Sequence, residues 1–520
     1  MNVHLMFRQK DFLPDIKALL QSSVLISDFQ LRRLEEQLQK ETADPAQKLC
    51  QSYQELAADL GLFRLLEQMA NGDKIILTAC SAALFAPLQN KEDISFRLDC
   101  LRDALHNRST IRQLYQTTID TEKQRAGSMY WLGSSYIDST YASGINLLKL
   151  YTEMLMKLRR TADAASGQFS SEGFQHLFAQ LKSELSDQYF AQVKSVLQSL
   201  TDQSGTMISA SFGSYLQGVD YVLRKKEDSH FWRHWQFSPA FTIADRDDEA
   251  AKDLGCRKGR AVNNAANAMA QAAENLQDFF AKLRLELSFY AGCINLADRL
   301  DQIHAPFCIP ELYPTSSEER NCRSLYDISL ALNQNTSVIG NDLSSDHKIL
   351  FLITGANQGG KSTFLRSIGQ AQLMAQCGMP VAAEQFACPI REKIFTHFKR
   401  EEDTAMKSGK LDEELARMDA IADSLVPGSM ILFNESFAAT NEREGSEICR
   451  QITQALIDHH VDVFFVTHLY AYAHAYCDLP CTESLRAERL DDGRRTFHII
   501  PGRPTQTAYG EDLYHKIFKK

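Results

Sequence analysis

The spacing of apolar residues predicts mostly helix through the first three fifths of this 520-residue chain. Residues 147–160, 174–199 and 261–301 are rich in Ala, Leu, Gln, Glu and Lys, and apolar residues recur in them every three or four positions. This spacing places the apolar side chains on one face of a helix. For residues 261–301, a heptad coiled coil and the packed helices of an ordinary α domain both fit the pattern, and we favour the packed helices.

Short, nearly continuous apolar runs replace this pattern later in the chain. ILFLIT at 349–354, MILF at 430–433 and VDVFFV at 461–466 alternate with helical stretches, which is typical of a parallel sheet covered on both faces. The distribution of proline agrees with this change from helices to strands, because four prolines lie in residues 1–305 and nine in the remainder. The segment between the two patterns, 309–348, is rich in Pro, Ser and Asn, and we expect it to be a linker.

Composition then excludes several classes of protein. The formal net charge of −10, from 56 Lys and Arg against 66 Asp and Glu, excludes a generally basic nucleic-acid coat but leaves room for a local basic cleft. No apolar stretch is long enough to cross a bilayer, and Arg8, Lys10 and Asp11 interrupt any N-terminal signal sequence. The 12 cysteines form no C-x-x-C pair. We therefore expect a cytoplasmic protein with no membrane partner and no disulfide framework.

A phosphate-binding motif follows the first apolar run. The sequence TGANQGGKST fits the pattern G-x-x-x-x-G-K-[ST], with Gly355, Gly360, Lys361 and Ser362 at its fixed points. Glycines let the backbone amides turn toward phosphate oxygens, the lysine neutralises the β- and γ-phosphates, and the hydroxyl binds Mg²⁺. A surface glycine turn is the alternative, but the apolar run before the motif and the helical run 364–376 after it favour an ATP and Mg²⁺ site.

The second apolar run ends in two polar residues that fit the same chemistry. Asn434 and Glu435 follow MILF at the carboxyl end of the predicted strand, where such sheets bind ligands. Glu435 is the candidate general base that activates water, and its alternative is an exposed strand-end carboxylate. Asn434 stands at the position where P-loop ATPases usually carry Asp. Because an amide adds no negative charge, we expect an ATPase with weakened Mg²⁺ binding or turnover.

The third apolar run is followed by His468. A histidine at this strand end can bond to the γ-phosphate or to the attacking water, and we favour that role over a purely structural one. Nearby histidines and cysteines raise the question of zinc, namely His459, His460, His474, Cys477 and Cys481. Their spacing matches no standard zinc site, so we expect core cysteines and surface histidines instead.

At these positions the sequence resembles the MutS family of DNA mismatch-repair ATPases. TGANQGGKST is similar to the family's TGPNxGGKST, including Asn357 and the doubled glycine Gly359 and Gly360. By this resemblance Thr363 also belongs to the phosphate loop. Residues 337–342 resemble the segment that packs on the adenine, which implies that role for Val338 and Ile339. Further similar stretches lie at 96–105, 373–383, 394–396, 435–445, 467–468 and 508–510.

The resemblance implies an architecture and an assembly. It implies a multidomain protein in which an all-α helical core and lever region precedes an α/β P-loop ATPase domain of the ABC-like kind. The implied division is a mostly helical region at 1–95, the core and lever with a candidate clamp at 96–310, and the ATPase domain at 311–520. Proteins of this family are homodimers in which loops of one subunit close the nucleotide site of the other, and nucleotide state controls a clamp around DNA.

The departures from the family pattern carry information as well. No segment resembles the N-terminal mismatch-reading module, and no nuclease tail is expected, so we predict a divergent, shortened member. In the loop 407–412, Leu411 stands where the family has a serine that reaches the opposite subunit's nucleotide. Phe-Ala-Ala at 437–439 replaces Gly-Arg-Gly. The basic and aromatic stretch 224–237 fits a DNA contact and a buried amphipathic helix equally well.

Two functions follow from these observations. The first is a DNA-binding ATPase in which ATP binding and hydrolysis switch a dimeric DNA clamp, in mismatch repair or related DNA maintenance. The alternative is a nucleotide-gated protein-interaction ATPase with weak or no hydrolysis and no mismatch recognition. The helical segments upstream favour the first, whereas the missing mismatch-reading module, the acidic net charge, Asn434 and Leu411 favour the second.

Overall fold

The computed structural model describes residues 2–12, 53–128, 137–201, 207–224, 242–244, 246–400, 409–490 and 493–506. The chain divides into two compact units. Unit 1 comprises Met1–Leu5 and Asn107–Leu287, and unit 2 comprises Met6–His106 and Ser288–Lys520. Unit 1 is mostly helical, and unit 2 contains helices and two sheets. This difference between the units fits the expected multidomain architecture. The division at residues 95 and 310 stays a prediction.

Unit 1 is built from long helices that pack side by side. Its helices are α7 (Arg108–Ser128), α8 (Ile137–Ala165), η2 (Ser166–Gln168), α9 (Glu172–Glu184), α10 (Asp187–Thr201) and the first part of α11 (Asp248–Gln302). Ile145 of α8, Leu197 of α10 and Met269 of α11 are buried against one another. Tyr151 and Phe280 stack with ring centroids 5.9 Å apart. The favoured interpretation of residues 261–301, packed helices, therefore agrees with their contacts in this unit.

A short hairpin completes the described part of unit 1. Strands β1 (Met207–Phe212) and β2 (Gly218–Arg224) pair antiparallel around the turn η3 (Ser214–Leu216). Arg224 donates from Nε to Oγ of Ser209 at 2.9 Å. The rest of the basic and aromatic stretch, residues 225–237, lies outside the described residues.

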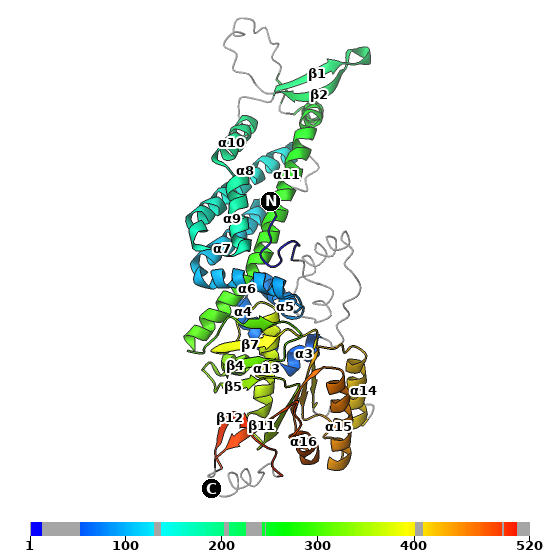
Figure 1. Ribbon diagram of the computed structural model, residues 1–520. Helices are drawn as coiled ribbons and strands as arrows, with labels where there is room; N and C mark the ends of the chain where they lie inside the picture. Colours follow the sequence, from blue (N-terminus) through cyan, green and yellow to red (C-terminus); the bar gives the residue numbers. More distant parts are fainter. Residues whose placement is uncertain are drawn as a thin grey trace, which may run out of the picture. The chain divides into compact units, whose positions relative to one another are not determined.

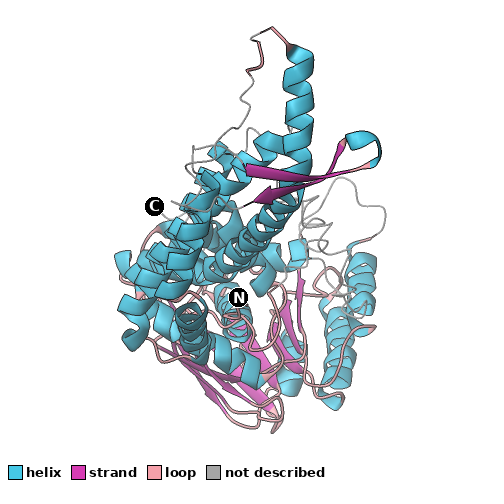
Figure 2. Ribbon diagram, turned by 90° about the horizontal axis from the view of Figure 1, so that it is seen from above, coloured by secondary structure: helices cyan, strands magenta, loops and turns pink. Residues whose placement is uncertain are grey.

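Unit 2 contains a six-stranded sheet whose central strands are parallel. Its order is β12-β11-β6-β10-β9-β8, and only the edge strand β12 runs antiparallel to its neighbour. The strands are β6 (Leu350–Gly355), β8 (Ile394–Phe398), β9 (Met430–Asn434), β10 (Asp462–Val466), β11 (Thr482–Arg489) and β12 (Arg495–Pro501). The three apolar runs of the sequence form β6, β9 and β10, so the predicted parallel sheet is confirmed. Figure 1 labels its strands β11 and β12, and Figure 2 draws the strands of the chain in magenta.

A second sheet corrects one expectation. The segment 309–348 was expected to be a linker, but it forms three of four strands in the order β3-β7-β4-β5. These strands are β3 (Glu311–Tyr313), β4 (Arg320–Leu325), β5 (Asn341–Ser345) and, from further along, β7 (Gln385–Pro389). Buried and exposed residues alternate in β5, so only one face carries a core and the strand lacks a continuous apolar run.

Helices cover both faces of the six-stranded sheet, which explains the continuous apolar runs. On one face, Phe433 and Phe465 join a core formed with α14, α15 and α16. These three helices lie together beside the sheet in Figure 1. On the other face α13 packs against β6, β9 and β10. The helices of unit 2 are α3 (Tyr53–Asp59), α4 (Leu62–Ala70), α5 (Lys74–Leu84), α6 (Lys91–His106), the end of α11, α12 (Ile328–Gln334), α13 (Lys361–Gln376), α14 (Lys410–Ala422), α15 (Glu442–Asp458) and α16 (Tyr470–Tyr476).

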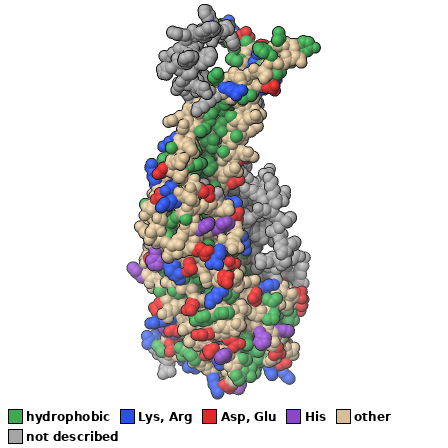
Figure 3. Space-filling model, turned by 45° about the horizontal axis from the view of Figure 1, so that its top comes forward, with side chains coloured by type: hydrophobic (Ala, Val, Ile, Leu, Met, Phe, Trp, Pro, Cys, Tyr) green, Lys and Arg blue, Asp and Glu red, His purple; other side chains and the backbone are tan. Residues whose placement is uncertain are grey.

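The surface carries both signs of charge. On the face drawn in Figure 3, acidic and basic side chains are interspersed rather than separated. This distribution agrees with the net charge of −10 and with the exclusion of a generally basic coat. Among the described residues, none of the helices combines the length and the apolar character that a membrane span needs.

Candidate nucleotide site

The phosphate loop joins β6 to α13 in a conformation that needs glycine. Gly355 has φ 108° and Gly360 has φ 91°, both in the left-handed region that glycine adopts readily. A Cβ atom on Gly359 would lie 2.7 Å from Cβ of Ala487 on β11, so a side chain there would clash. The loop ends where α13 begins at Lys361, and the helix N-terminus adds a positive dipole end. The loop therefore has the backbone form of an anion cradle.

Lys361 lies inside this loop. Its Nζ donates to the carbonyl oxygens of Gly355 at 3.0 Å and Ala356 at 3.1 Å. Burial lowers the pKa of Lys361, the negative charge of Glu435 opposes that shift, and Arg495 adds to it. The ammonium group is thus held by weak neutral acceptors in a position from which phosphate oxygens can replace them.

Ser362 and Asn434 meet across the sheet. Oγ of Ser362 donates to Oδ1 of Asn434 at 2.7 Å, although the two residues are 72 positions apart. The contact is possible because only β10 lies between β6 and β9, and the three parallel strands have their carboxyl ends at the same edge of the sheet. Hydroxyl and amide oxygens are hard ligands that suit Mg²⁺, but both are neutral here. The pair fits a magnesium ion with less electrostatic attraction than a carboxylate would provide.

Glu435 is the first residue beyond β9 and holds an uncommon backbone conformation. Its φ is 55°, which lies in the left-handed region. This conformation costs energy for any residue that has a side chain. Its N–H donates to the carbonyl oxygen of Val466 at 2.9 Å, which anchors the turn to β10. Its charge acts on Lys361, so the carboxylate lies within electrostatic reach of the loop.

A buried network supports the turn after Glu435. His397 of β8 shares hydrogen bonds with Oγ of Ser436 at 2.7 Å and with the carbonyl oxygen of Glu414 at 3.0 Å. Burial lowers the pKa of His397 to about 4, so the ring is neutral near pH 7. Oε2 of Glu414 accepts from the N–H of Phe437 at 2.7 Å, and burial raises the pKa of this carboxyl group. No local sequence pattern indicates this network, because its members are far apart in the chain.

The remaining predicted residues make fewer contacts in the described part of the chain. Val338 is half-buried and Ile339 is 45 % exposed, in the turn between α12 and β5. His468 is exposed after β10, and among the described residues no hydrogen bond joins it to the loop. Asn357 is exposed, and its carbonyl oxygen accepts from Nε of Arg495 at 3.4 Å. Arg495 is a loop neighbour that no sequence pattern indicated. Thr363 follows Ser362 in the first turn of α13.

The loop proposed to reach a second subunit is only partly described. Residues 407 and 408 lie outside the described part, as do residues 508–510. Leu411, in the first turn of α14, packs against the core on the sheet. This packing gives a physical reason for leucine at a position where the family pattern has serine.

Comparison with known proteins now adds the family. A model of the MutS2 N-terminal domain matches residues 89–303, and a model of MutS domain V matches residues 351–510. The DNA mismatch repair protein MutS of Thermus aquaticus is 29 % identical over 185 residues, which are 35 % of this chain and 22 % of that protein. MutS protein homolog 4 of Homo sapiens is 27 % identical over 213 residues, 41 % of this chain and 22 % of that protein. The matched region thus spans about a fifth of the length of these relatives.

Proposed function

We propose a function for this chain from one premise: it belongs to the MutS family, as the two domain models and the curated relatives together show. The function is that of a DNA-binding ATPase, in which ATP binding and hydrolysis switch a dimeric clamp on DNA. The process is mismatch repair or related DNA maintenance in the cytoplasm. The relatives' names support the DNA part, since both are named as MutS proteins and one as a DNA mismatch repair protein.

The hydrogen bond between Ser362 and Asn434 is the observation that best supports the proposed binding of ATP and Mg²⁺. It places the hydroxyl of the phosphate loop at the end of β9, so that one oxygen pair can hold Mg²⁺ beside Lys361. A bound Mg²⁺ would neutralise charge on the β- and γ-phosphates. The loop backbone from Gly355 to Gly360 would bind phosphate oxygens, and the exposed Ile339 with Val338 would pack on the adenine.

Glu435 supplies the base in this proposal. It accepts a proton from water as the water oxygen attacks the γ-phosphorus, and the bond from that phosphorus to the β–γ bridging oxygen breaks. ADP and inorganic phosphate are the products. His468 at the end of β10 would orient the water or bond to the γ-phosphate. Asn434 leaves the metal site with less charge than an Asp would give, and slow turnover is the expected consequence.

A second copy of the chain would complete the site. One chain carries one phosphate loop, and the candidate covering segments, 407–412 and 437–445, would come from the partner in a symmetric homodimer. ATP would then stabilise the dimer, because it binds the closed form more tightly than the open one.

DNA binding with and without Mg-ATP is the experiment that tests this function. Fluorescence anisotropy of labelled homoduplex, mismatched and branched DNA, at salt from about 50 to about 200 mM, should show affinity that falls steeply with salt and changes with ATP. Nucleotide binding with no DNA binding at the lowest salt would overturn the DNA function.

That outcome would favour the alternative, a nucleotide-gated protein-interaction ATPase. Two observations support it: the neutral amide of Asn434 at the metal position, and the packing of Leu411 into the core where a serine would serve the partner's nucleotide. Under this alternative, ATP changes the affinity of the chain for another protein and not for DNA.

A further inference from the structure

The turn that carries Glu435 is strained and depends on contacts from outside it. Glu435 has φ 55° and Phe437 has φ 59°, so a residue on each side of Ser436 takes the left-handed conformation, which costs energy when a side chain is present. The N–H of Glu435 is bound to the carbonyl oxygen of Val466, but this bond fixes only the start of the turn. The contacts of Ser436 and Phe437 therefore determine whether Glu435 keeps its conformation.

Ser436 binds His397 of β8 at two points. Both side chains are fully buried. Oγ of Ser436 lies 2.7 Å from Nδ1 of His397 and 2.5 Å from the carbonyl oxygen of the same residue. At the far side of the ring, Nε2 lies 3.0 Å from the carbonyl oxygen of Glu414, which can only accept. Nε2 therefore carries the proton of the neutral ring, and the Ser436 hydroxyl donates to Nδ1 and to the carbonyl oxygen of His397.

Glu414 links this turn to α14 from the other side. Its carbonyl oxygen fixes the ring of His397, and Oε2 of its carboxylate accepts from the N–H of Phe437 at 2.7 Å. Burial raises the pKa of Glu414, whereas the hydrogen bond from Phe437 and the positive charges of neighbouring Arg and Lys side chains oppose this shift. One residue of α14 thus holds both the partner of Ser436 and the residue that follows it.

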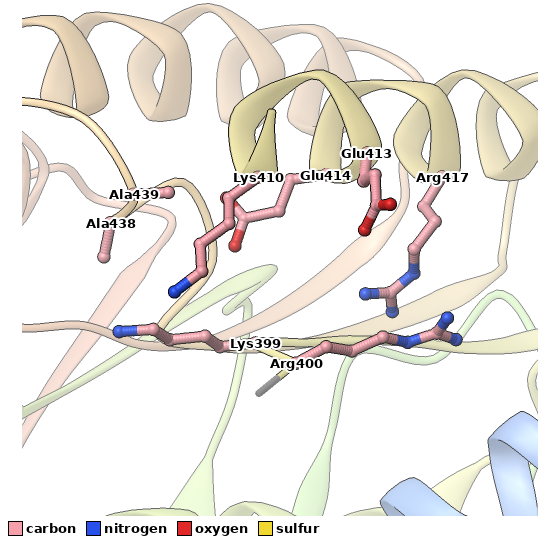
Figure 4. Close-up of a pocket in the computed structure, with 8 residues that line it drawn as sticks. All are labelled: Lys399, Arg400, Lys410, Glu413, Glu414, Arg417, Ala438 and Ala439. Atoms are coloured by element: carbon pink, nitrogen blue, oxygen red, sulfur yellow. The ribbon is translucent and has the colours of Figure 1, made fainter. Parts of the chain in front are cut away.

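A small cavity lies next to this link. Its volume is about 150 Å³, and it lies between the end of β8, the first turns of α14 and the loop after β9. Figure 4 shows Glu414 on α14 at this cavity, with Ala438 and Ala439 on the neighbouring loop. The N–H of Lys399, which also lines the cavity, donates to the carbonyl oxygen of Asn434 at 3.0 Å, so the cavity lies beside Asn434. Because a cavity lies between α14 and the loop here, the hydrogen bonds of Glu414 provide a polar link between them.

This network reaches Glu435 but not the phosphate loop. In the described part of the chain, no hydrogen bond joins Ser436 or His397 to residues 355–363. The charge of Glu435, by contrast, acts on Lys361 within that loop. A change in the network should therefore affect the base and leave the phosphate-binding groups in place.

We propose that His397 is a positioning residue for ATP hydrolysis: through Ser436 it holds Glu435 in the conformation in which the carboxylate can activate water. This proposal rests on the proposed ATPase function. His397 itself contacts neither the nucleotide nor the attacking water, and it exchanges no proton in the reaction. Because Glu414 fixes His397, a displacement of α14 would reach the base by the same route.

Steady-state ATP hydrolysis by the full chain tests this role with Ser436→Ala, which removes one hydroxyl and leaves the ring of His397 in place. The matched control is Ser429→Ala, because Ser429 is also fully buried and lies before the opposite end of β9. In Ser436→Ala, kcat should fall about 10²-fold while KM for ATP stays unchanged, because the base is misplaced and the phosphate loop is intact. Ser429→Ala should change neither value.

A second background separates positioning from a merely structural role. Ser436→Ala is combined with Glu435→Gln, and the double variant is compared with Glu435→Gln alone in single-turnover assays with excess protein. If Ser436 and His397 act through Glu435, the double variant is no slower, because the base that they position is already absent. A structural effect would slow hydrolysis by the same factor in both backgrounds.

Thermal melting establishes that each variant is folded. If Ser436→Ala does not fold, His397→Gln replaces it, since this variant removes the ring nitrogen next to Ser436 and keeps an amide that can donate to Glu414. Three results would overturn the positioning role and leave the ATPase: an unchanged kcat in Ser436→Ala, an equal fall in kcat in the Ser429→Ala control, or equal slowing in both backgrounds. Absence of ATP hydrolysis by the wild type at saturating Mg-ATP would overturn the ATPase function, and the positioning role with it.

Discussion

The two halves of the nucleotide site are built in different ways. In the phosphate loop the backbone itself forms the site, with Gly355 and Gly360 at positive φ and Gly359 pressed against Ala487. At the end of β9 side chains form the site, and Asn434 and Glu435 depend on neighbouring strands and helices for their positions. The first half keeps every fixed position of its motif, and the second departs from the family pattern.

The two halves differ in how many residue substitutions their structures tolerate. A Cβ atom at Gly359 would clash and no other residue adopts φ 108° as easily as Gly355, so the loop tolerates almost no change. At the second half, Phe437 has φ 59° where the family pattern has glycine. Its ring is fully buried and stacks on His397 at 5.0 Å, which offsets the backbone strain. Packing can thus replace glycine where no ligand touches the backbone.

The largest effect is expected from Lys361→Ala, which tests the first half. The variant removes the ammonium group that lies among the loop carbonyls, and no other lysine in the described part occupies the loop. ATP binding should be lost, measured by fluorescence of a labelled nucleotide. Lys252→Ala is the control for loss of one positive charge. Unchanged affinity in Lys361→Ala would refute the phosphate-loop assignment.

Glu435→Gln tests the second half with the next largest effect. The amide keeps the shape of the side chain but cannot accept the proton from water, so turnover should fall by about 10²–10⁴ while ATP still binds. The closed dimer should then accumulate with Mg-ATP, measured by sedimentation at several protein concentrations. Glu249→Gln, in the exposed first turn of α11, is the matched control. A variant that stays monomeric throughout would contradict the two-subunit site.

His397 allows a test of the packing that supports the second half. The folded pKa of about 4 lies below the ordinary value of 6.5, so protons bind the unfolded chain first and stability falls as the pH drops from 6.5 to 4. Between about pH 7 and pH 5 this group alone should remove about 2 kcal/mol of unfolding free energy.

Urea denaturation of the wild type and of His397→Asn at both pH values isolates this contribution. The raised pKa values of Asp59 and Glu414 act in the opposite direction, but they are present in both proteins and cancel in the comparison. The variant should be less stable at pH 7 and should depend less on pH. Equal pH dependence in the two proteins would show that His397 is not buried in its neutral form.

The sequence predicts the central sheet and the phosphate loop because both leave a local signal. Strands buried on two faces give continuous apolar runs, which is why β6, β9 and β10 are found at the predicted positions. The loop has fixed spacing because its backbone contacts the ligand. Such features lie within a dozen residues of one another and need no knowledge of the fold.

Features that depend on distant residues leave no such signal. The buried Arg320 of β4 pairs with Asp462 of β10 at 2.9 Å, 142 positions away, and nothing near Arg320 in the sequence indicates this partner. The cavity beside Asn434 combines residues from β8, α14 and the loop after β9 in the same way. The contact between Arg495 and Asn357 also joins distant positions, so a single sequence gives no indication of it.

The smallest expected effect, from Asn434→Asp, decides whether the departure in the second half matters for chemistry. A carboxylate at this position would still accept the hydrogen bond of Ser362, and it would add a negative charge beside the proposed metal. One charge-assisted contact is worth about 1.4 kcal/mol, so the Mg²⁺ concentration for half-maximal hydrolysis should fall about tenfold. ATPase assays across a magnesium titration measure this, with Asn333→Asp on α12 as the control for added charge. A variant that is folded but shows an unchanged or higher magnesium requirement would mean that the neutral amide is not what limits this site. The difference between the two halves would then lie in packing alone.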